Sequence, residues 1–343
     1  MTAGMDQDVA GSVTTISIVV PVSAGQDYLR LLVQEIGGLR EAWRGNGAPI
    51  VLSELIMVDD SAKDSSPEIM EALAREHDWI VTLHLARNYG QHGATIAGIL
   101  YSSGDWVVTM DEDLQHPPSR IPELLQRAVE SRADIAYARP TAPVHDAKMR
   151  DWTSVAFKRL LRWLTDNPNL ADVNSFRLLR GEIARSSASV AMHDTYFDVN
   201  LTWFTQRIIA VPMALRDERF IRTGKSGYRL RTLVAHAWRM LFSSQLKVLQ
   251  LSTLLGFSTI AVTILLALGI IVAKIVSPAS IQVQGWPSLI VAISFFGGVI
   301  MFMQGITLQY LSALVLRAHG KPSFFVIDRS RDEALARYFQ AHR

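Results

Sequence analysis

The chain has no cysteine among its 343 residues. This absence excludes disulfide bonds, thiolate metal ligands and a cysteine nucleophile, and it is compatible with a reducing cytoplasm. Charge is also scarce, because charged residues make up 19% of the chain and apolar residues 49%. The formal net charge of +2 gives no indication that the protein binds nucleic acid.

The N-terminal stretch MTAGMDQDVAGSVTT lacks a basic segment followed by an apolar core. We therefore expect no secretory signal peptide, and we expect residues 1–14 to be a flexible N-terminus. The chain contains two regions that differ in their pattern of apolar residues, one in the first two hundred residues and one in the last hundred.

The first region alternates short apolar runs with helical patterns. The runs rich in Val, Ile and Leu are ISIVVPV (16–22), ELIMVDD (54–60), WIVTLHLA (79–86) and WVVTMD (106–111). The helical patterns fall at 26–44, 66–77, 91–102 and 119–131. Such alternation predicts an α/β domain with a mostly parallel, Rossmann-like sheet that helices cover on both faces.

Polar residues end several of these predicted strands. Asp59 and Asp60 follow the second run, and Asp111, Glu112 and Asp113 follow the fourth. Pro21 and the pair Arg87-Asn88 stand at the ends of the other two runs. Ligands of parallel α/β sheets bind at the carboxyl ends of the strands, so we expect these residues to meet at one edge.

The acidic group after the fourth run has the spacing of a metal site. In an extended segment Asp111 and Asp113 would point the same way and Glu112 the opposite way, and Gln115 would continue the alternation. Oxygen ligands without His or Cys partners favour Mg²⁺ or Mn²⁺. We predict such a metal on Asp111, Asp113 and Gln115, and the alternative is a solvated acidic turn.

The second region is apolar enough for membrane spans. No charged residue occurs from Val248 to Ala273, and a second apolar stretch runs from Trp286 to Leu316. We predict a two-helix transmembrane hairpin over 248–316, with spans at about 248–273 and 287–312, since a bilayer core needs about 20 apolar residues in a helix. The alternative for the first stretch is a buried soluble helix.

Basic residues orient this hairpin. The link carries only Lys274, whereas several arginines and lysines precede the first span and others lie in the tail, 317–343. Both termini and the domain at 15–228 are therefore expected in the cytoplasm. Residues 229–247 have apolar side chains at helical spacing among basic ones, which predicts an amphipathic helix on the membrane surface or, alternatively, an ordinary surface helix.

Several motifs in order carry a resemblance to a known family. They are VDDSAKDSS, ARNYGQHGATIAG, GDWVVTMDEDLQHPPSRIPEL, NSFRLLRGEI and GKSGY, followed by the predicted hairpin. Over residues 15–327 the chain resembles the polyprenyl-phosphate glycosyltransferases of family 2, of GT-A type, such as dolichol-phosphate mannose synthases and undecaprenyl-phosphate sugar transferases. The stretch RNYGQH looks most like the bacterial enzymes that load formylated aminoarabinose onto undecaprenyl phosphate.

The resemblance implies an inverting transferase that moves a sugar from a nucleotide diphosphate sugar to polyprenyl phosphate in the bacterial plasma membrane. A UDP-sugar is favoured, and a GDP-sugar is the alternative. Asp111 and Asp113 would be the catalytic, metal-binding pair. The residues implied in nucleotide-sugar binding are Pro21, Asp59, Asp60, Arg87 and Glu112. From the residues alone, a strand-end ion pair is the alternative for Asp59 and Arg87.

The lipid acceptor needs fixed positive charge near the membrane, and bidentate arginine suits a phosphate. The candidate ligands of the lipid phosphate are Arg177, Arg219, Arg222, Lys225, Tyr228 and Arg229. Gly224 and Gly227 would let the backbone approach the phosphate closely. The alternative is that these cations only face anionic lipid.

The chain departs from the family pattern at three places. Ser23-Ala24-Gly25 replaces the usual aromatic-Asn-Glu, Ser175 stands where many relatives have Asp, and Gly227 replaces a Lys before Tyr228. The departure at Ser175 leaves the identity of any general base open. Two other functions are alternatives. One is a polysaccharide synthase, although the chain does not contain the Gln-x-x-Arg-Trp motif of those enzymes. The other is a non-catalytic membrane partner subunit of another transferase. A homo-oligomer is also left open.

Overall fold

The structure is a computed structural model that describes residues 13–141, 174–191, 196–215, 285–318 and 322–328, with a few single positions besides. The chain divides into two units. One comprises Met1–Ala237 together with Pro322–Arg343, and the other comprises Trp238–Lys321. The first unit contains all the strands described below, and the described part of the second contains one long helix.

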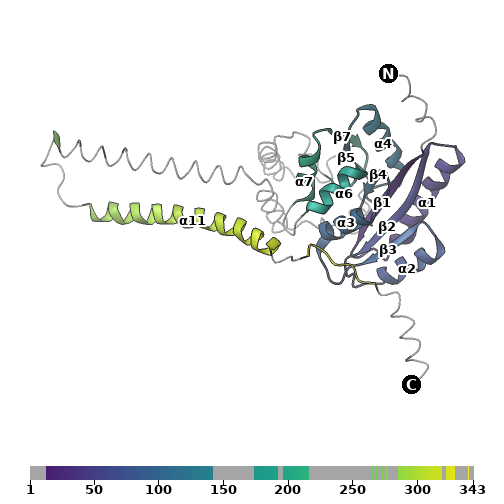
Figure 1. The fold of residues 1–343 in the computed structure, drawn as a ribbon, viewed down its shortest axis with the longest axis horizontal. Helices are drawn as coiled ribbons and strands as arrows, with labels where there is room; N and C mark the ends of the chain where they lie inside the picture. Colours follow the sequence, from purple (N-terminus) through teal and green to yellow (C-terminus); the bar gives the residue numbers. More distant parts are fainter. Residues whose placement is uncertain are drawn as a thin grey trace, which may run out of the picture. The chain divides into compact units, whose positions relative to one another are not determined.

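Seven strands form one sheet in the order β3-β2-β1-β4-β6-β5-β7 (Figure 1). Their bounds are β1 Thr14–Val22, β2 Ile50–Asp59, β3 Ile80–His84, β4 Trp106–Thr109, β5 Ile135–Pro140, β6 Arg177–Arg180 and β7 Ile208–Met213. Strands β3, β2, β1 and β4 run parallel. Strand β6 is antiparallel to both β4 and β5, while β7 is parallel to β5. The predicted α/β domain with a mostly parallel sheet is therefore confirmed.

Helices cover both faces of this sheet, as the continuous apolar strands predicted. One apolar cluster joins the strands to α1 (Leu29–Gly45), α2 (Ser66–Glu76) and α4 (Ile121–Glu130). A second cluster joins the other face to three further helices. They are α3 (Gly90–Tyr101), α6 (Gly181–Val190) and α7 (Phe197–Phe204).

Helix α3 packs unusually close to the sheet because of a glycine. A Cβ atom added at Gly98 would lie 2.3 Å from Val19 Cγ1 and 3.1 Å from Val58 Cγ2. The missing side chain thus lets the helix rest directly on β1 and β2. Because residues of the first turn of α3 reach the carboxyl edge of the sheet, this packing fixes their height above the strands.

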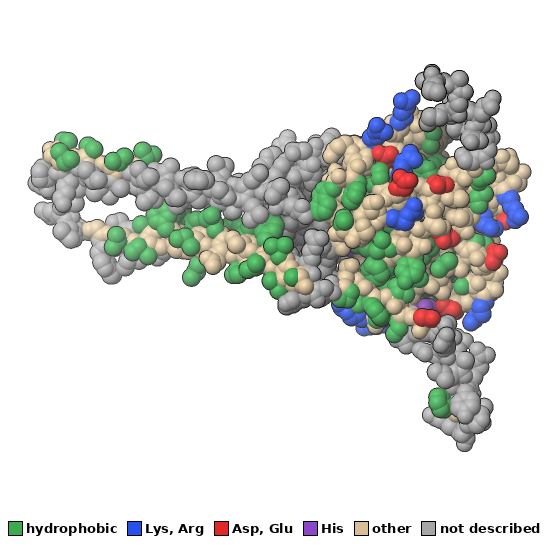
Figure 2. Space-filling view, in the orientation of Figure 1, with side chains coloured by type: hydrophobic (Ala, Val, Ile, Leu, Met, Phe, Trp, Pro, Cys, Tyr) green, Lys and Arg blue, Asp and Glu red, His purple; other side chains and the backbone are tan. Residues whose placement is uncertain are grey.

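Helix α11 in the second unit runs from Trp286 to Ala318. Its 33 residues span about 50 Å, more than the hydrocarbon core of a bilayer. Within it, Phe295–Ser312 has the length and composition of a membrane span, and none of that window is buried. Hydrophobic side chains lie along its surface (Figure 2). Met301 and Phe302 are among the exposed ones.

The predicted two-helix hairpin is not shown, because the described residues contain one helix of this kind. The first predicted span, 248–273, lies outside the described residues except for single helical positions such as Leu265 and Leu268. The predicted surface helix at 229–247 also lies outside them. The second predicted span, 287–312, corresponds to α11, which is longer at its C-terminal end by more than a turn.

Candidate active site

The site is built where the parallel strands β1, β2, β3 and β4 end. Each strand leads into a loop, and carboxylates tie these loops to one another. The loops carry Ser23-Ala24 after β1, Asp60 after β2, Arg87–Tyr89 after β3 and Asp111–Gln115 after β4. The expected gathering of polar strand ends at one edge is therefore present.

Asp60 holds the loop between β3 and α3. Its carboxylate accepts hydrogen bonds from the backbone N–H of Tyr89 at 2.6 Å and of Gly90 at 2.9 Å. The side-chain amide of Asn88 donates to the backbone carbonyl of Asp60 at 3.1 Å. Burial raises the pKa of the Asp60 carboxyl, and the two backbone donors partly offset that rise. Asp60 thus shapes the loop that presents Arg87, whose guanidinium lies 4.1 Å from the centre of the Tyr89 ring.

Glu112 ties the loop after β4 to the loop after β1. Its carboxylate accepts from the backbone N–H of Ser23 at 3.3 Å and of Ala24 at 3.2 Å. Burial raises the pKa of Glu112 to about 7, and the negative charges of Asp111 and Asp113 contribute to the rise. The sequence Ser23-Ala24-Gly25, which departs from the family pattern, is therefore held by its backbone.

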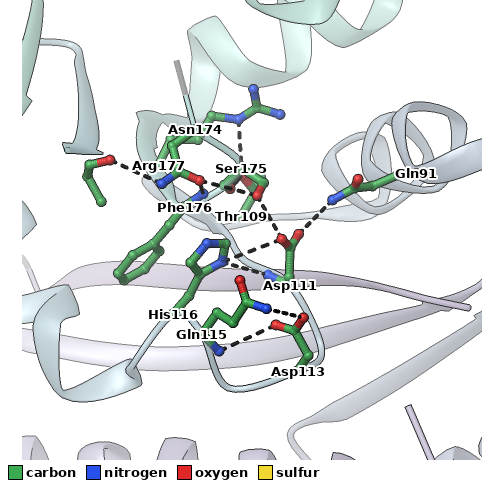
Figure 3. Close-up of polar contacts among 11 residues, drawn as sticks. Gln91, Thr109, Asp111, Asp113, Gln115, His116, Asn174, Ser175, Phe176 and Arg177 are labelled. Atoms are coloured by element: carbon green, nitrogen blue, oxygen red, sulfur yellow. Dashed lines mark hydrogen bonds and ion pairs between the residues drawn. The ribbon is translucent and has the colours of Figure 1, made fainter. Parts of the chain in front are cut away.

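Asp111 is oriented by neutral donors on both sides (Figure 3). The amide Nε2 of Gln91 donates to Asp111 Oδ1 at 2.6 Å, and the hydroxyl of Ser175 donates to Asp111 Oδ2 at 2.9 Å. The backbone N–H of Asp111 donates to His116 Nδ1 at 3.0 Å. His116 is buried, stacks on Phe176, and has its pKa lowered by burial, so its ring is neutral at pH 7.

Asp113 lies in a turn rather than in an extended segment. Leu114 has a φ of 61°, in the left-handed region, and the chain bends there. Asp113 accepts hydrogen bonds from the backbone N–H of Gln115 at 3.3 Å and from its side-chain amide at 3.0 Å. The expectation that Asp111, Asp113 and Gln115 alternate along an extended strand end is therefore wrong, because the turn at Leu114 breaks that geometry.

The donor set nevertheless fits a hard divalent cation. Among the described residues, the ion-pair contact found for Asp111 is the one to His116, at 3.9 Å, and that ring is neutral. The Asp111 side chain is 29% exposed, so its negative charge is open to a ligand. Carboxylate and amide oxygens are the ligands that Mg²⁺ and Mn²⁺ prefer. The described residues contain no group of three or more His, Cys, Asp or Glu side chains placed for a metal.

Asp59 pairs with a histidine that the sequence analysis did not consider. His84 Nδ1 lies 3.0 Å from Asp59 Oδ2, and His84 Nε2 lies 2.9 Å from Glu71 Oε1. The other oxygen of Asp59 accepts from the backbone N–H of Ala62 at 2.7 Å. The strand-end ion pair considered for Asp59 therefore exists, with His84 instead of Arg87. Pro21 is buried within β1, opposite Val58 of β2.

Arg177 lies beneath the site in a buried ion pair. Its guanidinium binds the carboxylate of Asp198, which also accepts a hydrogen bond from the hydroxyl of Tyr137 at 2.7 Å. Arg177 Nε donates to the hydroxyl of Thr109 at 3.0 Å, and Thr109 in turn donates to the backbone carbonyl of Ser175 at 2.7 Å. Arg177 and Asp198 are each less than 5% exposed. Arg177 thus supports the backbone at Ser175, and its engaged guanidinium does not reach a lipid phosphate in this arrangement.

Comparison with known proteins identifies the domain that carries this edge. Residues 17–185 match the family described as Glycosyl transferase family 2. The chain carries a family 2 glycosyltransferase domain. The match begins in β1 and ends in α6, so it includes all four strand ends of the site.

Two relatives align with most of the glycosyltransferase. The undecaprenyl-phosphate 4-deoxy-4-formamido-L-arabinose transferase of Pseudomonas aeruginosa strain LESB58 is 27% identical over 278 residues, 80% of this chain and 79% of its own. The bactoprenol glucosyl transferase of Shigella phage SfX is 25% identical over 315 residues, 92% of this chain and 99% of its own. Both alignments extend beyond the residues of the family 2 match.

Among solved structures, the chain is similar to mannosyl-3-phosphoglycerate synthase from Rubrobacter xylanophilus, with a TM-score of 0.49 and 16% identity over 69% of this chain and 74% of that one. It is also similar to glucosyl-3-phosphoglycerate synthase from Mycobacterium tuberculosis in complex with Mn²⁺, UDP-glucose and phosphoglyceric acid. That similarity has a TM-score of 0.44 and 19% identity, over 67% of this chain and 79% of that one.

Sequence reasoning found the acidic residues of this glycosyltransferase but missed the neutral ones that orient them. Gln91 stands in the RNYGQH stretch and His116 in DLQHPP, so both lay in quoted motifs without an assigned role. Ser175 was noted as a departure from the family, and the structure places its hydroxyl against Asp111. The lipid-phosphate candidates Arg219, Arg222, Lys225, Tyr228 and Arg229 lie outside the described residues.

The His84 cluster predicts a pH dependence of stability. The hydrogen bond to Asp59 and the contact with Glu71 raise the pKa of His84 above its usual 6.5 despite its burial. The charged imidazole therefore stabilises the fold fully below about pH 6.5, and this contribution is lost as the pH rises through the raised pKa. The melting temperature of His84→Gln should fall further below that of the wild type at pH 6 than at pH 9. A difference that does not change with pH would contradict the charged pair.

Proposed function

We propose that this glycosyltransferase moves a sugar, with inversion, from a nucleotide diphosphate sugar to polyprenyl phosphate and releases polyprenyl-monophosphate sugar. The names of the two aligned relatives, which act on undecaprenyl phosphate and bactoprenol, support this acceptor. The apolar surface of α11 supports a place in the membrane. A UDP-sugar is the favoured donor, on the RNYGQH stretch.

The observation that carries the proposal is the clamped carboxylate of Asp111 at the carboxyl edge of the sheet. Gln91 and Ser175 fix both of its oxygens without neutralising its charge. Asp111 and Asp113 would hold Mg²⁺ or Mn²⁺, with Gln115 as a further oxygen ligand. When bound, such an ion supplies positive charge to the diphosphate leaving group.

The loops around Asp111 would bind the rest of the donor. Asp60 fixes the loop that presents Arg87, and Glu112 fixes the backbone at Ser23 and Ala24. Arg87 is exposed next to this edge, where its guanidinium is available to the nucleotide. Asp59 would act on the nucleotide through the loop that it holds, because its two oxygens already contact Ala62 and His84.

Attack by the acceptor phosphate does not require a strong general base. A phosphate oxygen is already anionic near neutral pH, so it needs positioning and desolvation more than deprotonation. This is consistent with a hydroxyl at Ser175 in place of a carboxylate. Fixed cations must offset the approach of two anionic substrates, and we assign that role to Arg219, Arg222, Lys225 and Arg229, with the hydroxyl of Tyr228 as a further donor to the lipid phosphate.

The membrane orientation belongs to the same proposal. Lys274 alone in the link, against several basic residues in the flanks, favours cytoplasmic termini and a cytoplasmic catalytic domain in the bacterial plasma membrane. The amphipathic segment 229–247 would then lie on the cytoplasmic surface of the bilayer. This placement brings the basic candidates to the height of a lipid phosphate.

The metal assignment predicts a loss of catalysis without a loss of fold. Asp113→Asn should lower kcat by at least 10²-fold, about 3 kcal/mol of transition-state stabilisation, because a preorganised charge is removed. Asp78→Asn, an exposed aspartate before β3, is the matched control and should keep wild-type activity. Transfer from a UDP-sugar to undecaprenyl phosphate is the assay, and undiminished transfer in EDTA would rule out the metal.

The acceptor assignment predicts a separate kinetic defect. Arg222→Ala or Lys225→Ala should raise the KM for polyprenyl phosphate, because each removes a cation from the phosphate site. Binding of UDP with Mn²⁺ should change little. Arg222→Lys should restore only part of the activity if the contact is bidentate. Lost nucleotide binding with a normal lipid KM would instead move these residues to the donor side.

A further inference from the structure

The chain returns to the catalytic domain after helix α11. Residues 322–328, here called the C-terminal strap, belong to the same unit as the sheet although they follow the long apolar helix in sequence. The backbone N–H of Ala86 donates to the carbonyl of Phe325 at 2.9 Å, and the backbone N–H of Ile327 donates to the carbonyl of His84 at 2.9 Å. These bonds form an antiparallel bridge between Leu85 and Val326.

Side chains of the strap complete the apolar cluster on the α3 face of the sheet. Phe324 and Val326 pack against this cluster, which includes the buried Leu85, and Tyr89 packs against it as well. The strap also passes close to the first turn of α3. A Cβ atom added at Gly93 would lie 3.4 Å from the carbonyl oxygen of Ser323.

The strap lies next to the loop that carries Arg87. It pairs with residues 84–86, which lead directly into Arg87, Asn88 and Tyr89. The same loop is held from its other end by the carboxylate of Asp60, through the backbone N–H of Tyr89 and Gly90. The loop that presents Arg87 thus has two anchors, one from the residue that follows β2 and one from a segment more than 200 residues later in the sequence.

We infer that the C-terminal strap positions the Arg87–Tyr89 loop for the nucleotide sugar, so that the segment following the last membrane helix is part of the donor site. This inference rests on the proposed function, in which that loop binds the nucleotide. Val326 and Ile327 are positioning residues, because they act through the backbone of His84, Leu85 and Ala86.

Loss of the strap should weaken binding of the donor. An undocked strap leaves the backbone groups of His84 and Ala86 to water and removes two apolar side chains, Phe324 and Val326, from the cluster that contains Leu85. The Arg87–Tyr89 loop would then adopt other conformations as well. Because only a fraction of the molecules would have the conformation that binds the donor, the apparent affinity for the donor would fall. The backbone bonds of the strap go to His84 and Ala86 after β3, so the aspartates in the loop after β4 and the acceptor side should be unaffected.

A substitution at Ile327 tests the backbone anchor. Ile327→Pro removes the N–H that donates to His84, while Ile327→Val keeps it and changes the side chain little. We expect Ile327→Pro to weaken the binding of UDP in the presence of Mn²⁺ about tenfold and to raise the KM of the UDP-sugar similarly. The KM for polyprenyl phosphate should stay at the wild-type value. Ile327→Val should match the wild type in all three measurements.

A cross-link distinguishes lost docking from general damage. The chain has no cysteine, so Leu85→Cys with Val326→Cys places a single pair of thiols in the protein. Residues facing each other in a non-hydrogen-bonded antiparallel pair have Cα atoms about 4.5 Å apart, within the range that a disulfide requires. Oxidation of this pair in the Ile327→Pro background should restore UDP affinity, and reduction should abolish the rescue.

These measurements distinguish a failure of the inference about the strap from a failure of the proposed function. If the wild type binds UDP and Ile327→Pro binds it equally well, the role of the strap is wrong while the proposed function stands. An altered lipid KM with normal UDP affinity would also overturn the inference. If the wild type binds neither UDP nor a UDP-sugar, the donor assignment of the loop fails, and both the proposed function and this inference fall with it.

Discussion

The candidate site depends on two carboxylates, the buried Asp60 and the half-buried Glu112, that accept hydrogen bonds from backbone N–H groups of neighbouring loops. Four parallel strands end side by side, and nothing in a sheet ladder fixes the loops beyond those ends. Asp60 fixes the loop before α3, and Glu112 fixes the loop after β1. Each bond costs desolvation of a charge, and the raised pKa of Asp60 and Glu112 is the sign of that cost.

The result is an edge at which the carboxylates of Asp60, Asp111 and Glu112 lie among neighbouring loops. Asp111 stands at its centre, and its neutral neighbours Gln91, Ser175 and His116 set its orientation without lowering its charge. Below it, the Arg177–Asp198 pair is neutral as a whole and supports Ser175 through Thr109. The buried pair therefore supports the edge from below, while the Asp111 carboxylate stays partly exposed at its surface.

The sequence predicted the parallel half of the fold because its signals are local. Continuous runs of Val, Ile and Leu marked β1, β2, β3 and β4, and the acidic residues after them marked the edge. The other half was harder: β6 reads RLLR, four residues whose antiparallel pairing with β4 depends on a partner far away in sequence. The turn at Leu114 was also missed, since a positive φ at a leucine has no local sequence signal.

Contacts between distant segments escaped prediction for the same reason. Arg177 was predicted at a lipid phosphate because arginine suits phosphate, yet Asp198 of α7 neutralises it within the core. His84 was unassigned because its partners, Asp59 and Glu71, lie on different elements. The C-terminal strap reads as an ordinary tail, and only its bridge to Leu85 reveals that it belongs to the sheet edge.

The central claim is that a clamped aspartate at this edge serves transfer of a sugar, and not of a sugar phosphate, to a lipid phosphate. The most direct measurement is the pair of products formed from a UDP-sugar, Mn²⁺ and undecaprenyl phosphate by the purified full-length protein. The account predicts release of UDP together with a lipid whose mass rises by one sugar residue. Release of UMP with a lipid carrying a diphosphate sugar, or no lipid product with any of a panel of nucleotide sugars, would contradict it.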